Sequence, residues 1–383
     1  MKRIYLDYAA TTPIRREALE AMSANLACAA ANPSSLHTEG RAARAALDDA
    51  RAIVAACLHA KPREIVFTSG GTEANNLAIL GVARARRADG MHLITGAIEH
   101  RATLRAFEVL RDEGFEATVL PVDGQGRVDS QEFARAITPR TTFASIMLGN
   151  NEIGTLQPII EIAAIARAHG IVLHTDAVQA AGKIPLDVKV LGIDLLSLSA
   201  HKFEGPKGVG VLYVRQGTPI AGLLVGGGQE SGLRAGTENI AGIVGCATAL
   251  APATAEAPQA FERVALLRDR FEAGVQALVP GAQANGARAQ RLPHISSMRF
   301  PGVDAGELLI HLDLGGIAAS TGSACAAGVP EPSHVLAALG IPARALGGVI
   351  RFSMGRMSTD DEIISVLNRL SSIMQAVPAE ERS

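Results

Sequence analysis

The sequence predicts an α/β protein with a doubly wound, mostly parallel sheet in a large domain and a smaller α+β domain towards the C-terminus. From Ile65 onward, short apolar runs of strand length alternate with longer runs of helical periodicity. This alternation is typical of βαβ units, in which a helix joins each strand to the next parallel strand. The chain has 383 residues, of which 48% are hydrophobic, and this is enough for a large core and two domains.

Four apolar runs are each followed by a helical run. They are "EIVFTSGG" before "TEANNLAILGVARARR", "MHLITG" before "RATLRAFEVLRDEG", "TFASIML" before "PIIEIAAIARAHG", and "IVLHTD" before "AVQAAGKIPL". The stretch "DLLSLSAHKFEGPKGVGVLYV" instead contains two β-rich runs around a polar turn. Because ligands of such sheets bind beyond the carboxyl ends of the strands, the residues that follow each strand are the first candidates for a site.

An Ala/Pro/Thr-rich stretch, Ala249–Phe261, is predicted to interrupt the α/β pattern, although a helix could also begin there. We place the domain boundary at this stretch. Residues 14–258 then form the large domain, and residues 1–13 together with 259–383 form the small domain, which carries the loop with Cys325. Beyond the boundary come a helical run, the strand "HISSMRF", the cysteine loop, and a final strand and helix.

Charge and cysteine usage exclude several classes of protein. The 36 basic and 38 acidic residues give a net charge of −2, which is no electrostatic footprint for nucleic acid. The chain has cysteines at positions 28, 57, 246 and 325, which are far apart and form no CxxC pair. This spacing argues against a zinc site and against a disulfide framework. It favours a reducing compartment. Asp7 comes before the apolar core of a signal peptide could form, and no uninterrupted apolar run is long enough to span a bilayer. We expect a cytoplasmic protein without a metal, nucleic-acid or membrane partner.

Cys325 lies in a loop of glycine, alanine and hydroxyl residues, "ASTGSACAAG". A free cysteine is often a small buried filler, because Cys is among the most buried residue types. The alternative is a nucleophile on a mobile segment, and the polar residues at the strand ends favour it.

Polar residues that can do chemistry follow five of the predicted strands of the large domain. In chain order they are Ser69-Gly70-Gly71-Thr72, Glu99-His100, Asn150-Asn151-Glu152, Asp176 with Gln179, and Ser199 with His201 and Lys202. Glycines at a strand-to-helix turn with a hydroxyl at the helix start form an anion site from backbone N–H groups. Lys202 alone could be a lysine whose head reaches water.

Together these residues match the needs of pyridoxal 5′-phosphate. Lys202 gives the Schiff base, Asp176 keeps the pyridine nitrogen protonated, and hydroxyl and backbone N–H groups hold the phosphate. A metal site made of His174, Asp176 and His201 is an alternative, but it leaves Lys202 and the Gly-Gly-Thr turn unexplained.

Ten motifs in order over nearly the whole chain resemble the cysteine desulfurases of the NifS/IscS type, which are class V aminotransferases of pyridoxal-phosphate fold type I. The motifs are "LDYAATTP", "TSGGTEANN", "EHRA", "NNEIGT", "HTDAVQAAGK", "SAHKFEGPKGVGVLYV", "RAGTEN", "STGSAC", "EPSHVLAALG" and "IRFSMGR". The resemblance implies that Lys202 carries the cofactor and that Asp176 pairs with its ring nitrogen. It also implies that His100 stacks on the ring and takes part in proton transfer, and that Gln179 hydrogen-bonds the ring oxygen.

The resemblance also implies how the phosphate and the substrate are held. The phosphate ligands from the same subunit would be Gly71, Thr72, Ser199 and His201. Thr237 would reach the cofactor phosphate of a neighbouring subunit, which implies a homodimer. Asn151, which also borders the cofactor, and Arg351 would hold the substrate, and a guanidinium suits a carboxylate because it can form two parallel hydrogen bonds.

In the implied reaction, L-cysteine gives up its sulfur to Cys325 and leaves as alanine, and the persulfide passes to a sulfur acceptor or an iron–sulfur scaffold protein. The attack requires a thiolate. Three positions depart from the family pattern: Ser231 stands where an arginine is usual, and Ala326 and Ala327 stand where hydroxyl residues often follow the cysteine. A selenocysteine lyase, an aminotransferase that needs no Cys325, and a non-catalytic scaffold are the alternatives.

Overall fold

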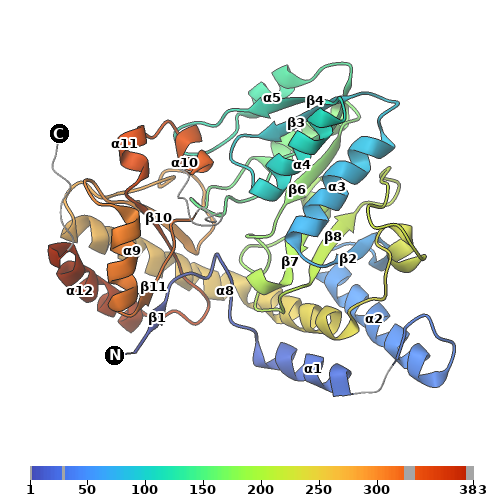
Figure 1. The fold of residues 1–383 in the computed structure, drawn as a ribbon, viewed down its shortest axis with the longest axis horizontal. Coiled ribbons are helices and arrows are strands. Elements are labelled where there is room, and N and C mark those ends of the chain that lie inside the picture. Colours follow the sequence, from blue (N-terminus) through green and yellow to red (C-terminus); the bar gives the residue numbers. More distant parts are fainter. Residues whose placement is uncertain (1, 28–30, 323–332, 377–383) are drawn as a thin grey trace.

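A seven-stranded sheet forms the centre of the larger part of the molecule in the computed structural model, which describes residues 2–27, 31–322 and 333–376 (Figure 1). Its strands, in spatial order, are β2 (Ile65–Thr68), β8 (Gly210–Val214), β7 (Leu195–Ser199), β6 (Val172–Asp176), β5 (Thr141–Ser145), β3 (His92–Gly96) and β4 (Glu116–Leu120). All neighbours pair in parallel except β8, which pairs antiparallel with both β7 and β2. The carboxyl ends of the other six strands therefore lie on one edge.

Helices cover both faces of this sheet, as the predicted doubly wound fold requires. The helices of the larger part are α1 (Arg16–Ala27), α2 (Thr38–Cys57), α3 (Gly71–Ala85), α4 (Arg101–Asp112), α5 (Ser130–Ala136), α6 (Ile159–Ala168), α7 (Val188–Leu191) and the first half of α8 (Ile240–Leu278), with short 3₁₀ turns η1 (Pro62–Glu64), η2 (Ala200–Lys202) and η3 (Gln229–Gly232). Successive strand residues point to opposite faces. On β7, Leu195 packs in the core under α3, and Leu196 packs in the core formed with α2, α6 and α8.

The smaller part has its own sheet and core. Its elements are β1 (Ile4–Tyr5) paired with β11 (Ile317–Ala318), a three-stranded sheet of β12 (Val349–Ser353), β10 (Ile295–Arg299) and β9 (Gln283–Ala284), and helices α9 (Ala305–Leu314), α10 (His334–Ala338), α11 (Ala343–Leu346) and α12 (Asp360–Ala376). One core cluster joins Ile4 and Leu6 from the start of the chain to Phe271, Phe352 and Leu370 near its end. Two segments far apart in sequence thus fold together, and both termini lie on this side (Figure 1).

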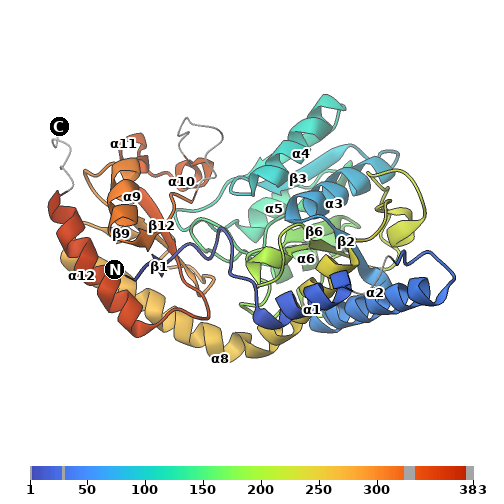
Figure 2. The ribbon, with the colours of Figure 1, turned by 60° about the horizontal axis from the view of Figure 1, so that its bottom comes forward.

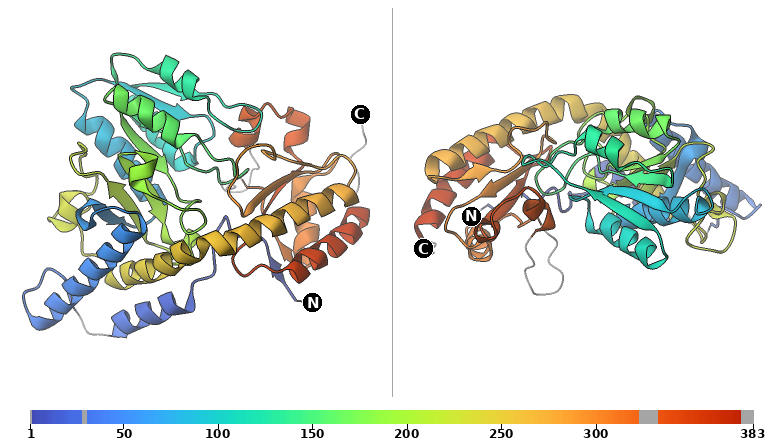
Figure 3. Two further views of the ribbon diagram at one scale, coloured as in Figure 1. Left: turned by 180° about the vertical axis from the view of Figure 1, so that it is seen from behind. Right: turned by 90° about the horizontal axis from the view of Figure 1, so that it is seen from above.

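Helix α8 runs without a break from the larger to the smaller part (Figures 2 and 3). The predicted interruption at Ala249–Phe261 is wrong, because this stretch lies inside α8 together with Pro252 and Pro258. Burial of Ala253 and Ala257 against the rest of the protein offsets the cost of the prolines. The division of the chain at residue 258 stays a prediction.

By length and composition alone, α8 is apolar enough to cross a membrane, with a mean hydropathy of 1.4 over its most apolar window. Half of that window is buried inside the fold. Cys246 and Leu250 are completely buried in the core below the large sheet, so α8 has the burial of a core helix.

Phe271 on α8 and Phe352 on β12 pack with their ring centroids 4.7 Å apart and their planes tilted by 56°, and both are completely buried. Substituting Phe271→Ala is expected to lower the free energy of unfolding by about 3–5 kcal/mol, because it removes a buried ring and leaves a cavity. Urea denaturation followed by circular dichroism measures the loss. Leu266→Ala on the exposed side of the same helix is the matched control; equal effects of the two substitutions would contradict the packing described here.

Candidate active site

The carboxyl edge of the large sheet brings the predicted strand-end residues together. β6 ends at Asp176, and the neighbouring strand β7 ends at Ser199, directly before the η2 turn that carries Lys202. His100 follows β3 and forms the N-cap of α4. Side chains from three strands therefore meet at one place, as the alternation of strands and helices predicts.

The ammonium of Lys202 is held by the start of the chain. Its Nζ donates hydrogen bonds of 2.7 Å each to the backbone carbonyls of Ala9 and Ala10. Burial and, after it, the positive charge of Arg351 lower the pKa of Lys202 to about 8, against the opposing effect of Asp7 and Asp176. The neutral, nucleophilic form of this amine is therefore far more populated near neutral pH than that of an ordinary lysine.

The carboxylate of Asp176 is buried and fixed in orientation. Asn75 Nδ2 on α3 donates to its Oδ2 over 2.6 Å, and the backbone N–H of Val178 donates to its Oδ1 over 2.9 Å. Hydrogen bonds of this kind stabilise the ionised form. The arrangement provides an oriented negative charge at the end of β6.

His100 stands at the exposed surface of the site, and its Nδ1 accepts a hydrogen bond of 3.1 Å from the backbone N–H of Ala102. Partial loss of hydration of the ring lowers the pKa of His100 below its ordinary value, Asp176 opposes this shift, and Lys202 adds to it. The ring is therefore neutral near pH 7. His100, Asp176 and Lys202 thus act on one another electrostatically.

Gln179 lies beside the same N-terminal carbonyls. Its Nε2 donates to the carbonyl of Ala9 over 2.9 Å, so Gln179 and Lys202 share this acceptor. Its Oε1 lies 3.4 Å from Nε2 of His294, which is completely buried. The side chain of Gln179, for which a hydrogen bond to the cofactor ring is predicted, therefore lies next to the amine of Lys202.

The turn after β2 has the properties of an anion site. Gly70 caps α3 without a side-chain hydrogen bond among the described residues, so the first N–H groups of α3 point beyond its end. A Cβ added at Gly71 would lie 2.8 Å from Val178 Cγ2 and 3.4 Å from Ser199 Cβ. Gly71 therefore lets the start of α3 pack directly against Val178 and the end of β7, and Thr72 is exposed beside it.

His201 and Thr237, two predicted phosphate ligands, differ in exposure: His201 is half-buried, and Thr237 is exposed. His201 Nδ1 is 3.1 Å from Thr11 Oγ1, and burial followed by the charges of Lys202, Lys207 and Lys183 lowers its pKa to about 4. Thr237 is exposed and lines a cavity of about 230 Å³ whose other walls include Thr68, Ser69 and Gly208.

Arg351 on β12 is buried and already engaged. Its Nη2 donates to Asp7 Oδ1 over 2.9 Å, and its Nη1 donates to the backbone carbonyl of Asn151 over 2.8 Å. Its Nε has no hydrogen-bond partner among the residues that the structure describes. Arg351 and Asn151 are thus brought together as predicted substrate residues, and the pairing of Arg351 with Asp7 is an addition to the sequence prediction.

Several predicted positions cannot be placed in this geometry. Cys325, Ala326 and Ala327 lie outside the described residues. Ser231 is exposed in η3 at φ +58°, beside Glu230, which forms a buried ion pair with Arg51.

His174, one of the three ligands of the alternative metal site, is buried in the core. Both ring nitrogens of His174 are within 2.9 Å of serine hydroxyls, Ser145 on β5 and Ser197 on β7, and burial lowers its pKa to about 3. No group of three metal-binding side chains occurs in the described part of the chain.

The chain belongs to the aminotransferase class-V family, which matches residues 4–366. A curated relative named cysteine desulfurase IscS, from Dictyoglomus turgidum, is 48% identical over 376 residues, covering 98% of this chain and 95% of the relative. A solved structure described as a NifS-like protein matches with a TM-score of 0.92 at 37% identity, over 98% of this chain and all of that chain. Another, described as SspA in complex with cysteine, matches with a TM-score of 0.81 at 37% identity, over 93% of this chain and 99% of that one. The predicted family and fold class are confirmed.

The residues at the carboxyl edge fit pyridoxal phosphate, which this family implies. The uncapped N–H groups at the start of α3, the fixed carboxylate of Asp176 and the amine of Lys202 with its lowered pKa suit its phosphate, its ring nitrogen and its aldehyde. Sequence reasoning missed the supporting residues Asn75 and Asp7, although both lie inside motifs that it quoted, "TSGGTEANN" and "LDYAATTP".

Sequence reasoning also gave no role to Lys183, which lies in the motif "HTDAVQAAGK". This lysine is buried, and its Nζ donates to the backbone carbonyl of Lys202 over 2.7 Å. Burial and, after it, the positive charge of Lys202 lower the pKa of Lys183 to about 7, against the opposing effect of Glu204.

Because the folded protein holds the Lys183 proton less tightly than the unfolded chain, folding stability rises with pH between about 7 and 10.5. Substituting Lys183→Met removes this contribution. Between pH 7 and pH 9, the unfolding free energy of the wild type should increase by about 2 kcal/mol more than that of the variant. Urea denaturation at both pH values measures this difference. Exposed Lys189→Met is the control and should follow the wild type; parallel pH profiles for Lys183→Met and the wild type would contradict the shifted pKa.

Proposed function

We propose that the protein is a pyridoxal-phosphate-dependent cysteine desulfurase, which converts L-cysteine to L-alanine and leaves the sulfur as a persulfide on Cys325. The observation that carries the proposal is the placement of Lys202 and Asp176 at adjacent strand ends in a chain of this family. The relatives named cysteine desulfurase, and the similar structure described with cysteine, support the substrate.

Pyridoxal phosphate supplies an aldehyde for an amine and a protonated ring that stabilises negative charge on the substrate carbon. Asp176, fixed by Asn75 and Val178, holds the proton at the ring nitrogen. Lys202 removes the Cα proton of the substrate and returns it, and its lowered pKa makes the neutral amine available for this task. His100, neutral near pH 7, borders the same space and takes part in proton transfer.

The phosphate and the substrate carboxylate are held by different parts of the molecule. The start of α3 with Gly71 and Thr72, together with Ser199 and His201, would hold the phosphate through N–H and side-chain donors. Arg351, which lies against Asn151, binds the substrate carboxylate through its guanidinium.

Cys325 acts on the substrate sulfur. An S–S bond forms between its Sγ and the substrate sulfur, and the C–S bond breaks with its electron pair remaining on carbon. That carbon takes a proton and becomes the methyl group of alanine. The persulfide then passes to a protein acceptor, such as an iron–sulfur scaffold protein.

Two substitutions test the proposal in the cofactor-loaded protein. Cys325→Ser should keep the visible absorption of the bound cofactor and lose roughly 100-fold or more of its alanine production from cysteine, because the nucleophile is gone. Lys202→Ala should lose the absorption of the lysine-linked cofactor. Absorption spectra and alanine and sulfide assays measure both effects.

The matched control is Cys57→Ser, since Cys57 is a partly buried thiol on α2. It should retain both absorption and activity. Full activity of Cys325→Ser would show that the nucleophile is wrongly assigned, and a wild type that takes up no cofactor would favour a non-catalytic scaffold.

We further propose that the protein is a homodimer in which Thr237 reaches the cofactor phosphate of the neighbouring subunit. Thr237 is exposed, and large apolar side chains are left exposed between α1 and α2 and before η3, namely Leu36 at 89% and Val225 at 94%. These two segments lie on the same side of the larger part, away from the smaller part (Figure 1). Exposed apolar surface of this kind is typical of an interface.

Sedimentation equilibrium should give a mass of about twice the chain mass of 39.7 kDa. Replacing Leu36 and Val225 by Asp should shift the protein towards the monomer, because it places charge in the interface. The exposed Leu314→Asp on α9 is the control. A wild type that sediments as a monomer would refute the dimer.

Cytoplasmic location is also part of the proposal. Cys57 and Cys246 are free thiols, which fits a reducing compartment.

A further inference from the structure

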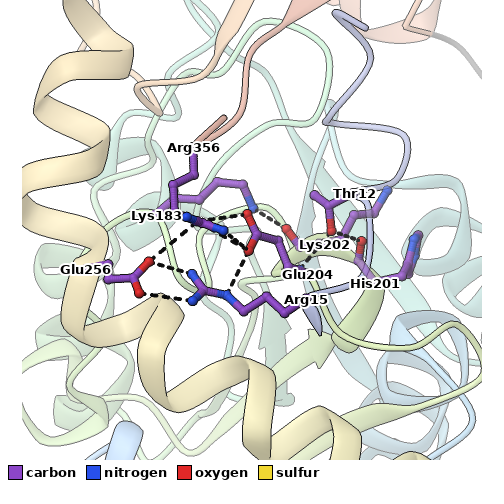
Figure 4. Close-up of polar contacts among 8 residues, drawn as sticks. All are labelled: Thr12, Arg15, Lys183, His201, Lys202, Glu204, Glu256 and Arg356. Atoms are coloured by element: carbon purple, nitrogen blue, oxygen red, sulfur yellow. Dashed lines mark hydrogen bonds and ion pairs between the residues drawn. The ribbon is translucent and has the colours of Figure 1, made fainter. Parts of the chain in front are cut away.

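Four charged side chains form a closed ring of ion pairs beside the turn that carries Lys202 (Figure 4). Arg15 Nε lies 2.7 Å from Glu204 Oε2, and the two Nη atoms of Arg15 donate to both oxygens of Glu256 over 3.0 and 2.6 Å. Arg356 Nη2 lies 3.1 Å from Glu204 Oε2, and its Nε lies 3.5 Å from Glu256 Oε2. Each arginine therefore stands between two carboxylates, and the ring has no net charge.

The side of the ring nearest Lys202 is the most buried. The side chains of Arg15 and Glu204 are 6% and 12% exposed, whereas those of Glu256 and Arg356 are 44% and 32% exposed. In such surroundings, removing one partner leaves an uncompensated charge that water does not screen. Glu204 is the more buried of the two carboxylates, and both arginines contact it.

The backbone of Glu204 is bound to the same part of the chain that holds Lys202. Its N–H donates to Thr12 Oγ1, and its carbonyl accepts from the N–H of Arg15, each over 2.8 Å. The N–H and hydroxyl of Thr12 both donate to the carbonyl of His201 (Figure 4). The segment Ala9–Arg15 therefore runs along the Lys202 turn, with the carbonyls of Ala9 and Ala10 at one end and the ion-pair ring at the other.

Glu204 keeps a backbone conformation that side chains rarely adopt, with φ +67°. Glycine would take this conformation without strain, and a strained residue persists where its surroundings impose it. The Glu204 side chain contacts both Arg15 and Arg356, and these contacts explain why a glutamate stands here in place of glycine.

The ring also joins the two parts of the molecule. Arg15 precedes α1, Glu204 follows η2, Glu256 belongs to α8, and Arg356 follows β12. Because β12 carries Arg351, the ring fixes the Lys202 turn relative to the strand that bears the substrate-binding arginine.

We propose that Glu204 is a positioning residue, which through Arg15 and Arg356 holds the segment Ala9–Arg15 against the Lys202 turn and so sets the contacts of the Lys202 amine. This inference rests on the proposed role of Lys202. The charged groups that face the amine are Arg351, Asp7 and Asp176, and Lys183 contacts the Lys202 backbone.

The test is the reactivity of the Lys202 amine in the full-length protein freed of cofactor. Acetic anhydride labels neutral amines, and a chymotryptic digest separates Lys202 from the exposed Lys207 by cleavage after Phe203, so that mass spectrometry compares the two. In Glu204→Gln, the segment Ala9–Arg15 is held less firmly, and the amine loses its alignment with the two carbonyls that stabilise its charged form. The labelling midpoint of Lys202 should move to lower pH, with roughly threefold or more labelling at pH 7 relative to Lys207.

Two further variants separate positioning from stability. Glu204→Gly removes the side chain and relieves the backbone strain, and should shift the midpoint like Glu204→Gln. Glu272→Gln breaks another buried ion pair, in which Glu272 binds both Nη atoms of Arg291 over 2.8 and 3.0 Å. Neither residue is among the charged groups that act on the Lys202 amine. It should lower the melting temperature without moving the Lys202 midpoint.

An unchanged midpoint in Glu204→Gln, or an equal shift in Glu272→Gln, would overturn the positioning role. Neither outcome depends on desulfurase activity. A wild type that binds no pyridoxal phosphate would refute the proposed function while leaving the labelling result valid.

Discussion

Parallel pairing in the large sheet is the constraint on which the site depends. Because only β8 runs against its neighbours, the strands that end at Asp176 and Ser199 finish on the same edge, and the turn with Lys202 follows there. The helices that return the chain cover both faces and leave this edge to irregular backbone. The site is therefore a product of topology first and of side-chain choice second.

The N-terminal segment completes what the sheet begins. Ala9 and Ala10 offer carbonyls to Lys202, and Asp7 offers a carboxylate to Arg351, so one short stretch touches both the amine and the guanidinium of the site. Burial would otherwise leave these cations without partners at a high cost in free energy. The same stretch pairs with β11 and β12, which ties the amine to the smaller part of the molecule.

The sequence was sufficient to predict the alternation of strands and helices and the strand-end residues, because both follow from local patterns. It was insufficient for contacts between distant segments, such as Asn75 with Asp176 or Asp7 with Arg351, since no periodicity connects them. The continuous helix α8 was missed for a related reason: Pro258 argues locally for a break, and tertiary burial decides otherwise.

That unbroken helix has a consequence for how the chain can change in length. Each residue added to an α-helix rotates everything beyond it by about 100° and advances it by about 1.5 Å. A single insertion near Ala253 would therefore turn the smaller part, with Arg351, out of register with Lys202, while an insertion in a surface loop would disturb only its neighbourhood. The spacing along α8 acts as a ruler between the two halves of the site, so the number of residues there is constrained independently of their identity.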